Sequence, residues 1–206
     1  MSKTVTGVAD DAVQEEILQV ALGLYRKYGP EKVTMDDVAN ATGRSRTSLY
    51  YYYKNRDEIY QAVLDTIVLG VANNIRIAAA AAATLDEKIY AFCTAKVKTS
   101  EEWKTIFKAM WISMNADEKS KHSRSMNTLH KKLIHQESII INEILADALN
   151  RNEIRNIGVG EQDMLAFIIS TGIRGIRNEV YNQDDPHDMK AAVRLLAGMV
   201  IKWLKS

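Results

Sequence analysis

The scarcity of helix-breaking residues is the feature that most restricts what this chain can fold into. Its 206 residues include two prolines, Pro30 and Pro186, and ten glycines. The alternation of β-branched or aromatic with polar residues that indicates a strand never continues for more than a few positions. Helix-forming residues dominate instead, and the alanine run 78–83 also favours helix. The sequence therefore predicts an all-α protein.

The composition is that of a globular protein, with 47% apolar and 26% charged residues. The single cysteine, Cys93, cannot form an internal disulfide and fits a reducing compartment. No apolar run approaches the roughly 18 to 20 residues of a membrane span. Residues 1–11 lack the basic-then-apolar pattern of a signal peptide. We therefore expect a cytoplasmic protein that does not contact a membrane.

Apolar spacing and the positions of chain-breaking residues divide the sequence into helices. Residues 1–11 are predicted to be disordered. The predicted helices cover residues 12–28, 35–42, 45–52, 56–82, 86–98, 101–115, 117–152, 161–182 and 187–205. The short helices form a predicted domain over residues 12–64, and the long helices form a bundle over residues 65–206. The helix from Arg56 joins the two.

The segment 38–56, VANATGRSRTSLYYYYKNR, has the spacing of a helix-turn-helix. Two short helices that cross steeply need a small residue at their contact, here Ala39. The tight turn needs a residue that tolerates positive φ, here Gly43. Leu49 then anchors the second helix to the core, and Tyr53 extends the same face. The first three-helix domain is therefore predicted to be a helix-turn-helix domain.

The outer face of the second helix is suited to a DNA groove. It carries Arg46, Thr47, Ser48, Tyr51 and Tyr52. Small hydroxyl residues let a helix enter a major groove, and arginine and tyrosine reach base edges or phosphates. Residues 40–56 also contain four cations and no acidic residue, in a chain whose net charge is +1. Each cation could neutralise one phosphate.

A helical hairpin inside some other bundle is the alternative for this segment, with the tyrosines 50–53 as core packing. Successive residues on a helix turn by about 100°, so four consecutive tyrosines cannot all face one core. Some of them must be exposed beside the cations. This favours the DNA-binding interpretation.

The stretch 17–64 resembles the DNA-binding domain of the TetR family of bacterial transcriptional repressors. The resemblance rests on a first helix that ends in aromatic-x-x-x-Gly, Thr34 before the second helix, the pair Val38-Ala39, Gly43, the pair Leu49-Tyr50, Tyr53, and Arg56 before two acids. Independently of the resemblance, Thr34 is predicted to cap the second helix, because Asp37 stands three residues on. The sequence departs from the family pattern at Arg44, where an apolar residue is usual, at Tyr52, where histidine is common, and at Arg56, which replaces lysine.

The resemblance implies that Thr34 and residues 46–52 face DNA, and that Tyr50 and Arg56 contact phosphates. Arg44 is expected to pack its stem and extend its head to a phosphate. The free amides at the start of the helix from Arg56 could hold a phosphate with Lys54. The candidate DNA-binding residues are Thr34, Arg44, Ser45, Arg46, Thr47, Ser48, Tyr50, Tyr51, Tyr52, Lys54 and Arg56.

The resemblance also implies a C-terminal domain that binds an effector and forms a homodimer through its last two helices. Two apolar stripes are assigned to that interface. They comprise Leu165, Ile169, Gly172, Ile173 and Ile176, followed by Val193, Leu196, Ala197, Val200 and Leu204. Gly172 and Ala197 would let these helices approach closely. A stripe that packs only inside one chain is the alternative.

An aromatic and methionine stripe is the candidate effector site. It comprises Trp103, Phe107, Met110, Trp111 and Met114, with Phe167 as a weaker candidate. Such a lining suits an apolar or planar small molecule, although a stripe of this kind can also be ordinary core. The implied mechanism is that two recognition helices enter successive major grooves of a near-palindromic operator, and the effector favours a spacing that no longer fits.

Catalytic and metal-binding patterns are absent from the sequence. His130 and His135 are five residues apart and would not share a helix face as ligands, and Gly158-Val-Gly160 is not a nucleotide fingerprint. We therefore predict a regulator that is not an enzyme and has no cofactor or metal. The alternatives are a helical ligand-binding protein or enzyme without DNA function, and an effector-independent DNA-binding protein.

Overall fold

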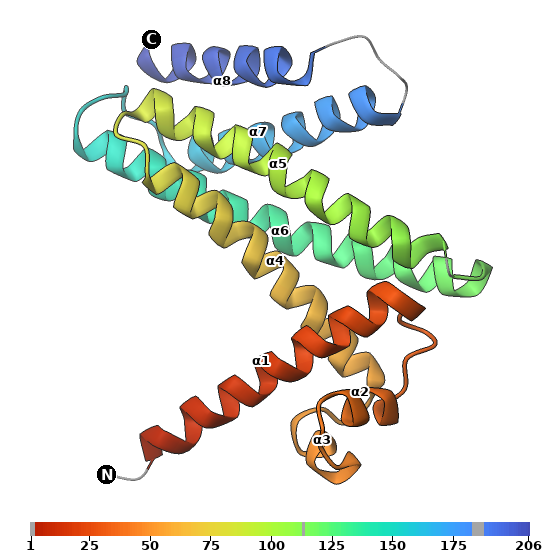
Figure 1. Ribbon diagram of the computed structural model, residues 1–206. Coiled ribbons are helices and arrows are strands. Elements are labelled where there is room, and N and C mark those ends of the chain that lie inside the picture. Colours follow the sequence, from red (N-terminus) through yellow and green to blue (C-terminus); the bar gives the residue numbers. More distant parts are fainter. Residues whose placement is uncertain (1–2, 113, 183–187) are drawn as a thin grey trace. The chain divides into compact units, whose positions relative to one another are not determined.

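The prediction of an all-α fold is confirmed. A computed structural model describes residues 3–112, 114–182 and 188–206, and these contain eight helices and no strand (Figure 1). The helices are α1 (Lys3–Tyr28), α2 (Met35–Ala41), α3 (Arg46–Tyr52), α4 (Arg56–Ala80), α5 (Leu85–Ile112), α6 (Ala116–Asn150), α7 (Val159–Asn182) and α8 (Met189–Lys205). The short α2 and α3 lie together beside α1, as a helix-turn-helix requires.

The helices form two compact units. The first unit comprises Met1–Val68 and Trp103–Leu129, and the second comprises Leu69–Glu102 and His130–Ser206. The first unit thus holds the predicted helix-turn-helix domain together with the end of α5 and the beginning of α6. The sequence prediction put residues 65–206 in one bundle. No pattern in the sequence indicates that the end of α5 and the beginning of α6 pack with the N-terminal helices.

The core of the first unit is built from one apolar face of each N-terminal helix. Its side chains are fully or almost fully buried, and they include Ile17, Ala21, Tyr25, Val38, Ala39, Leu49, Ile59 and Val63. Tyr25 and Tyr60 meet edge to face, with ring centroids 5.6 Å apart. Burial of this apolar area is the main stabilising contribution to short helices such as α2 and α3, which are too short to persist alone.

The core of the second unit is formed by α5, α6, α7 and α8 with the later part of α4. Buried members include Ile75, Ile89, Phe92, Ile140, Leu145, Ile169, Ile173, Val193 and Leu204. A Cβ atom added to Gly172 of α7 would lie 3.2 Å from a methyl carbon of Leu196 in α8. The predicted close approach of the last two helices at Gly172 is therefore confirmed, within a single chain.

The two largest differences from the predicted helix boundaries are in α1 and α5. α1 begins at Lys3 rather than residue 12, and the Tyr52 hydroxyl donates to Asp10 at 3.0 Å, which gives this early part of the helix a tertiary partner. α5 continues through the predicted break at 99–100. There the Thr99 hydroxyl donates to the Ala95 carbonyl at 2.8 Å, so the polar side chain is satisfied within the helix.

We expected that no segment could span a membrane. Judged by length and composition alone, this expectation is wrong for one helix. α4 is long and apolar enough to cross one, although a buried helix of a non-membrane protein can have the same character. In the first unit its side chains Ile59, Val63 and Ile67 are buried by protein. This part of α4 therefore packs as a core helix does, whereas Leu69 and Ile77 farther along α4 are exposed.

Candidate DNA-binding surface

The turn between α2 and α3 has the geometry that the sequence predicts. Gly43 has φ +65°, a conformation that strains residues with a side chain. The Arg44 amide donates to the Ala39 carbonyl at 2.9 Å, which closes the end of α2. Ser45 caps α3, because its hydroxyl accepts from the Ser48 amide at 3.1 Å. These two hydrogen bonds fix the direction of α3 relative to α2.

The predicted cap of α2 is confirmed. The Thr34 amide donates to the Asp37 carboxylate at 2.8 Å, and the Asp37 amide donates to the Thr34 hydroxyl at 3.2 Å. The hydrogen bonds from Thr34 hold the pKa of the Asp37 carboxyl below its usual value. Thr34 is thus fixed at the start of α2, and its hydroxyl donates to the Asp37 carboxylate at 2.7 Å.

α3 presents one face to the core and the other to solvent. Leu49 is fully buried, Tyr53 is buried, and Tyr51 is 76% exposed. Among the other candidate DNA-binding residues, Ser45, Arg46, Thr47, Tyr50 and Lys54 are exposed, whereas Arg44, Ser48, Tyr52 and Arg56 are half-buried. The structure therefore brings the predicted recognition residues onto one short helix and its flanks.

Three of the four predicted phosphate-binding cations have carboxylate partners on other segments. Arg44 pairs with Glu16 of α1 at 2.6 Å, and Arg46 pairs with Asp36 of α2 at 3.2 Å. Arg56 donates to the carboxylate of Glu31 at 2.7 Å and to its carbonyl at 2.6 Å. The phosphate contacts inferred for Arg44 and Arg56 stay predictions, because both guanidiniums already have structural partners.

Lys54 differs from these arginines. Its side chain is exposed, and among the residues that the structure describes no carboxylate pairs with its ammonium. The sequence count of four cations missed the compensating acids because they lie 10 to 28 residues away along the chain. Lys54 is thus the cation of this group most available to a phosphate.

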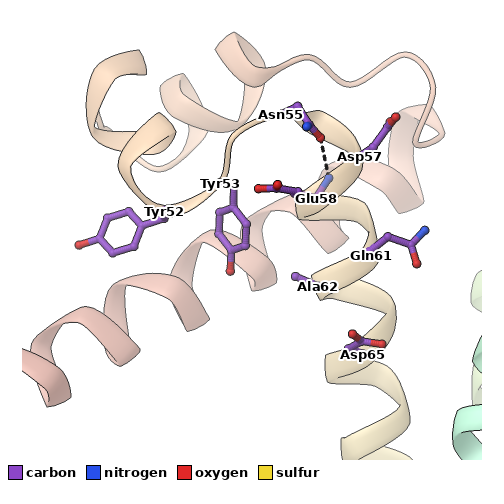
Figure 2. Close-up of a pocket in the computed structure, with 8 residues that line it drawn as sticks. All are labelled: Tyr52, Tyr53, Asn55, Asp57, Glu58, Gln61, Ala62 and Asp65. Atoms are coloured by element: carbon purple, nitrogen blue, oxygen red, sulfur yellow. Dashed lines mark hydrogen bonds between the residues drawn. The ribbon is translucent and has the colours of Figure 1, made fainter.

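The start of α4 is capped by the protein itself. The Glu58 amide donates to the Asn55 side-chain oxygen at 2.9 Å (Figure 2). The Lys54 amide donates to the Glu58 carboxylate at 2.7 Å. A phosphate bound at the start of α4, as the sequence predicts, would lie against the acceptor oxygens of Asn55 and Glu58. An open pocket of about 580 Å³ beside it is lined partly by Asp57, Glu58 and Asp65, whose negative charge is unfavourable for an anion.

The aromatic stripe lies mainly in the first unit. Trp103 and Phe107 are half-buried with ring centroids 6.3 Å apart, and Trp111 is 39% exposed. The side chain of Met110 lies outside the described residues, and Phe167 is exposed in the second unit. Phe167 and the stripe thus lie in different units. The role of the stripe as an effector site stays a prediction.

A small pocket of about 190 Å³ adjoins the end of this stripe. Met114, Tyr60 and His122 are among the side chains that line it. The Tyr60 hydroxyl and Nδ1 of His122 are 2.7 Å apart, so this bond connects α4 with α6 inside the first unit. Burial lowers the pKa of His122 and raises that of Tyr60, which keeps both side chains uncharged at neutral pH.

Polar groups that sequence reasoning missed lie inside the second unit. The buried Lys96 ammonium forms an ion pair with the fully buried Glu137 carboxylate. Nε2 of His130 accepts from the Arg174 guanidinium at 2.6 Å, and burial together with the neighbouring cations lowers the pKa of His130 to about 4. No sequence motif marks these pairs, because each joins residues on different helices.

The residues assigned to a dimer interface lie mostly in the core of one chain. Leu165, Ile169, Ile173, Val193, Ala197, Val200 and Leu204 are buried, and Gly172, Ile176 and Leu196 are partly covered. Packing inside one chain, the alternative, accounts for their burial, and a side chain already covered by its own chain has little area left for a second copy. Their assignment to a dimer interface stays a prediction.

Comparison with known proteins places the N-terminal helices in a family. Residues 17–63 match the bacterial regulatory proteins of the tetR family. The chain is 35% identical over 66 residues to the HTH-type transcriptional regulator YfiR of Bacillus subtilis, a match that covers 32% of each chain. It is 33% identical over 49 residues to IcaR of Staphylococcus epidermidis, a negative regulator of a biofilm operon, covering 24% of this chain and 26% of IcaR. The chain thus matches about a third or less of the length of these curated relatives.

Solved structures extend the likeness of fold to nearly the whole chain. A transcriptional regulator from Cytophaga hutchinsonii aligns with a TM-score of 0.61 at 16% identity, covering 93% of this chain and 98% of that one. FadR of Bacillus subtilis, solved with stearoyl-CoA, aligns with a TM-score of 0.55 at 14% identity, covering 92% and 98%. At such low identity the likeness concerns the fold, whereas the match over residues 17–63 concerns the sequence. The family likeness therefore rests on residues 17–63, which match the bacterial regulatory proteins of the tetR family.

Proposed function

We propose that the protein is a DNA-binding transcriptional regulator, and specifically a repressor. It binds a near-palindromic operator as a homodimer and is released by a small-molecule effector. Regulation by DNA binding places its action in the bacterial cytoplasm. The printed function of IcaR as a negative regulator supports repression as the direction of control.

The observation that carries this proposal is the two-faced character of α3. Leu49 fixes the helix to the core, while Arg46, Tyr50 and Tyr51 remain exposed on its other side. A second helix of a helix-turn-helix that projects such residues is suited to the major groove. An enzyme or a ligand-binding protein without DNA function would have no need for an exposed aromatic and cationic ridge on a helix of seven residues.

The Arg46→Ala variant tests the proposal most directly. We expect it to bind the operator more weakly by about 1–3 kcal/mol if Arg46 reads a base edge. The operator is first recovered by selecting bound duplexes from a random library, and affinity is then measured by fluorescence anisotropy. Arg151→Ala, at an exposed arginine of the second unit, is the matched control. If the wild-type protein enriches no sequence and binds no duplex, the proposal fails.

The homodimer is proposed to form through exposed apolar side chains of α7 and α8. These are Met164, Phe167 and Ile168 on α7 and Leu195, Met199 and Trp203 on α8. The three on α8 recur every four residues and therefore lie along one face of the helix. Exposed apolar patches of this kind mark protein–protein interfaces. Such a dimer carries two copies of α3, one for each half-site of a near-palindromic operator.

The Met199→Glu variant is expected to be monomeric, because it would bury an unpaired charge at the centre of this interface. Sedimentation velocity at micromolar concentration measures the result, and operator affinity is expected to fall with the loss of the second half-site contact. Ile77→Glu provides a control with the same charge at another exposed apolar side chain of the second unit. A wild-type protein that sediments as a monomer would contradict the dimer.

The effector is proposed to be an apolar or planar small molecule. FadR, a structural neighbour, was solved with stearoyl-CoA, and this supports ligand binding within the shared fold. α4 begins next to the helix-turn-helix and continues into the second unit, so it can transmit a change between them. A small-molecule panel that raises the melting temperature of the protein would favour a regulated repressor over an effector-independent DNA-binding protein.

A further inference from the structure

The ion pair between Arg46 and Asp36 is the most open of the arginine–carboxylate pairs around α3. The side chains of Arg46 and Asp36 are 59% and 56% exposed, respectively. In the pair of Arg44 with Glu16 the arginine is only 27% exposed, and Arg56 and Glu31 are each about one-third exposed or less. A duplex that lies against α3 would therefore meet both members of the Arg46–Asp36 pair.

Three contacts hold the Arg46 guanidinium against the outer face of α3. Its Nη1 donates to Asp36 at 3.2 Å, and its Nη2 donates to the Tyr50 hydroxyl at 3.3 Å. The guanidinium carbon also lies 5.6 Å from the centroid of the Tyr50 ring. A guanidinium has five N–H donors, so several remain available for a further acceptor while these contacts persist.

Asp36 is not needed to cap α2. The neighbouring Asp37 exchanges the hydrogen bonds with Thr34 that satisfy the start of the helix. Asp36 instead projects from the same turn towards the first residue of α3. A carboxylate at a surface that faces phosphates is electrostatically unfavourable for DNA binding, so its position beside a recognition arginine calls for another role.

We propose that Asp36 is a positioning residue that directs Arg46 to base edges and away from phosphates; this rests on the DNA-binding function proposed above. A phosphate can bind Arg46 only by competing with the negative charge of Asp36. The neutral guanine edge, with its O6 and N7 acceptors, can accept from the free donors of Arg46 while the ion pair with Asp36 remains. Asp36 therefore lowers non-specific affinity more than operator affinity.

The Asp36→Asn variant tests this inference on a random-sequence duplex and on the selected operator. We expect its affinity for the random duplex to rise by about fivefold, the upper range for releasing an exposed pair. The slope of log affinity against log salt should steepen by about one per subunit, because Arg46 can then neutralise a phosphate. Operator affinity should change less, so the ratio of specific to non-specific binding falls.

Three further variants separate positioning by Asp36 from a merely structural role. Asp36→Glu keeps the charge and should restore the wild-type slope and ratio. Asp117→Asn removes a matched carboxylate from the first turn of α6 and should change neither. In an Arg46→Ala background, Asp36→Asn should have no effect on the slope, because Asp36 acts through Arg46.

The outcomes distinguish this inference from the proposed function. If the wild-type protein binds no duplex, the DNA-binding function itself fails. If the wild-type protein binds and Asp36→Asn leaves the slope and the specificity ratio unchanged, the inference is wrong. It is also overturned if the steeper slope persists without Arg46, because Asp36 would then act only by repelling DNA directly.

Discussion

Replacing Leu49 with alanine is expected to lower the free energy of unfolding of the first unit by about 2–5 kcal/mol and to remove operator binding. Leu49 is the one buried side chain that α3 contributes, and it is fully enclosed. A seven-residue helix has no stability of its own, so its position depends on this side chain. The substitution would leave a cavity and allow α3 to detach.

Urea unfolding followed by circular dichroism measures the loss of stability, and anisotropy with the selected operator measures the loss of binding. Leu69→Ala makes the same chemical change at a leucine of α4 that is 58% exposed. It should alter stability by no more than about 0.5 kcal/mol. A Leu49→Ala variant with wild-type stability and operator affinity would show that α3 is held by other contacts.

Local features of this site could be predicted from the sequence because their causes are local. The cap between Thr34 and Asp37 spans three residues, and the positive φ of Gly43 follows from the tightness of one turn. The burial of Leu49 follows from its position relative to these two features. Such interactions are fixed by the order of a few neighbouring residues, so no tertiary information is needed to find them.

The charge pairing at the same site could not be predicted in this way. Arg44 meets Glu16, and Arg56 meets Glu31, only after α1 and the loop that follows it pack against the helix-turn-helix. Counting charges along a segment therefore overestimated the positive charge that DNA would encounter. The capping of α4 by Asn55 and Glu58 has a local sequence signal, an acidic residue three positions after an asparagine, which could have been recognised.

The exposed and buried faces of the last two helices were difficult to separate for a different reason. α7 has apolar residues on both sides, with Leu165 and Ile169 buried but Met164 and Ile168 exposed. Periodicity identifies an apolar stripe but does not tell which stripe meets its own chain and which meets a partner. The packing of α7 against α8 shows which stripe meets its own chain.

Replacing Glu137 with leucine is expected to lower the free energy of unfolding by about 3–5 kcal/mol, because it leaves the Lys96 ammonium buried without its counter-charge. Both side chains are almost completely inaccessible, and Glu137 lies on α6 whereas Lys96 lies on α5. Burial lowers the pKa of Lys96, and the neighbouring Glu137 carboxylate opposes that shift. The pair thus compensates for desolvation that neither group could tolerate alone.

The double variant Lys96→Met, Glu137→Leu separates the effect of an orphaned charge from the loss of packing. We expect it to be close to the wild type in stability or more stable by about 1–4 kcal/mol, because no charge remains to be desolvated. Glu143→Leu, which breaks the exposed pair with Arg76, should cost no more than about 1 kcal/mol. Urea denaturation of the four proteins gives all of these values. A Glu137→Leu variant no less stable than Glu143→Leu would mean that the Lys96 ammonium either deprotonates or reaches water when its partner is removed, and that the second unit does not depend on this pair.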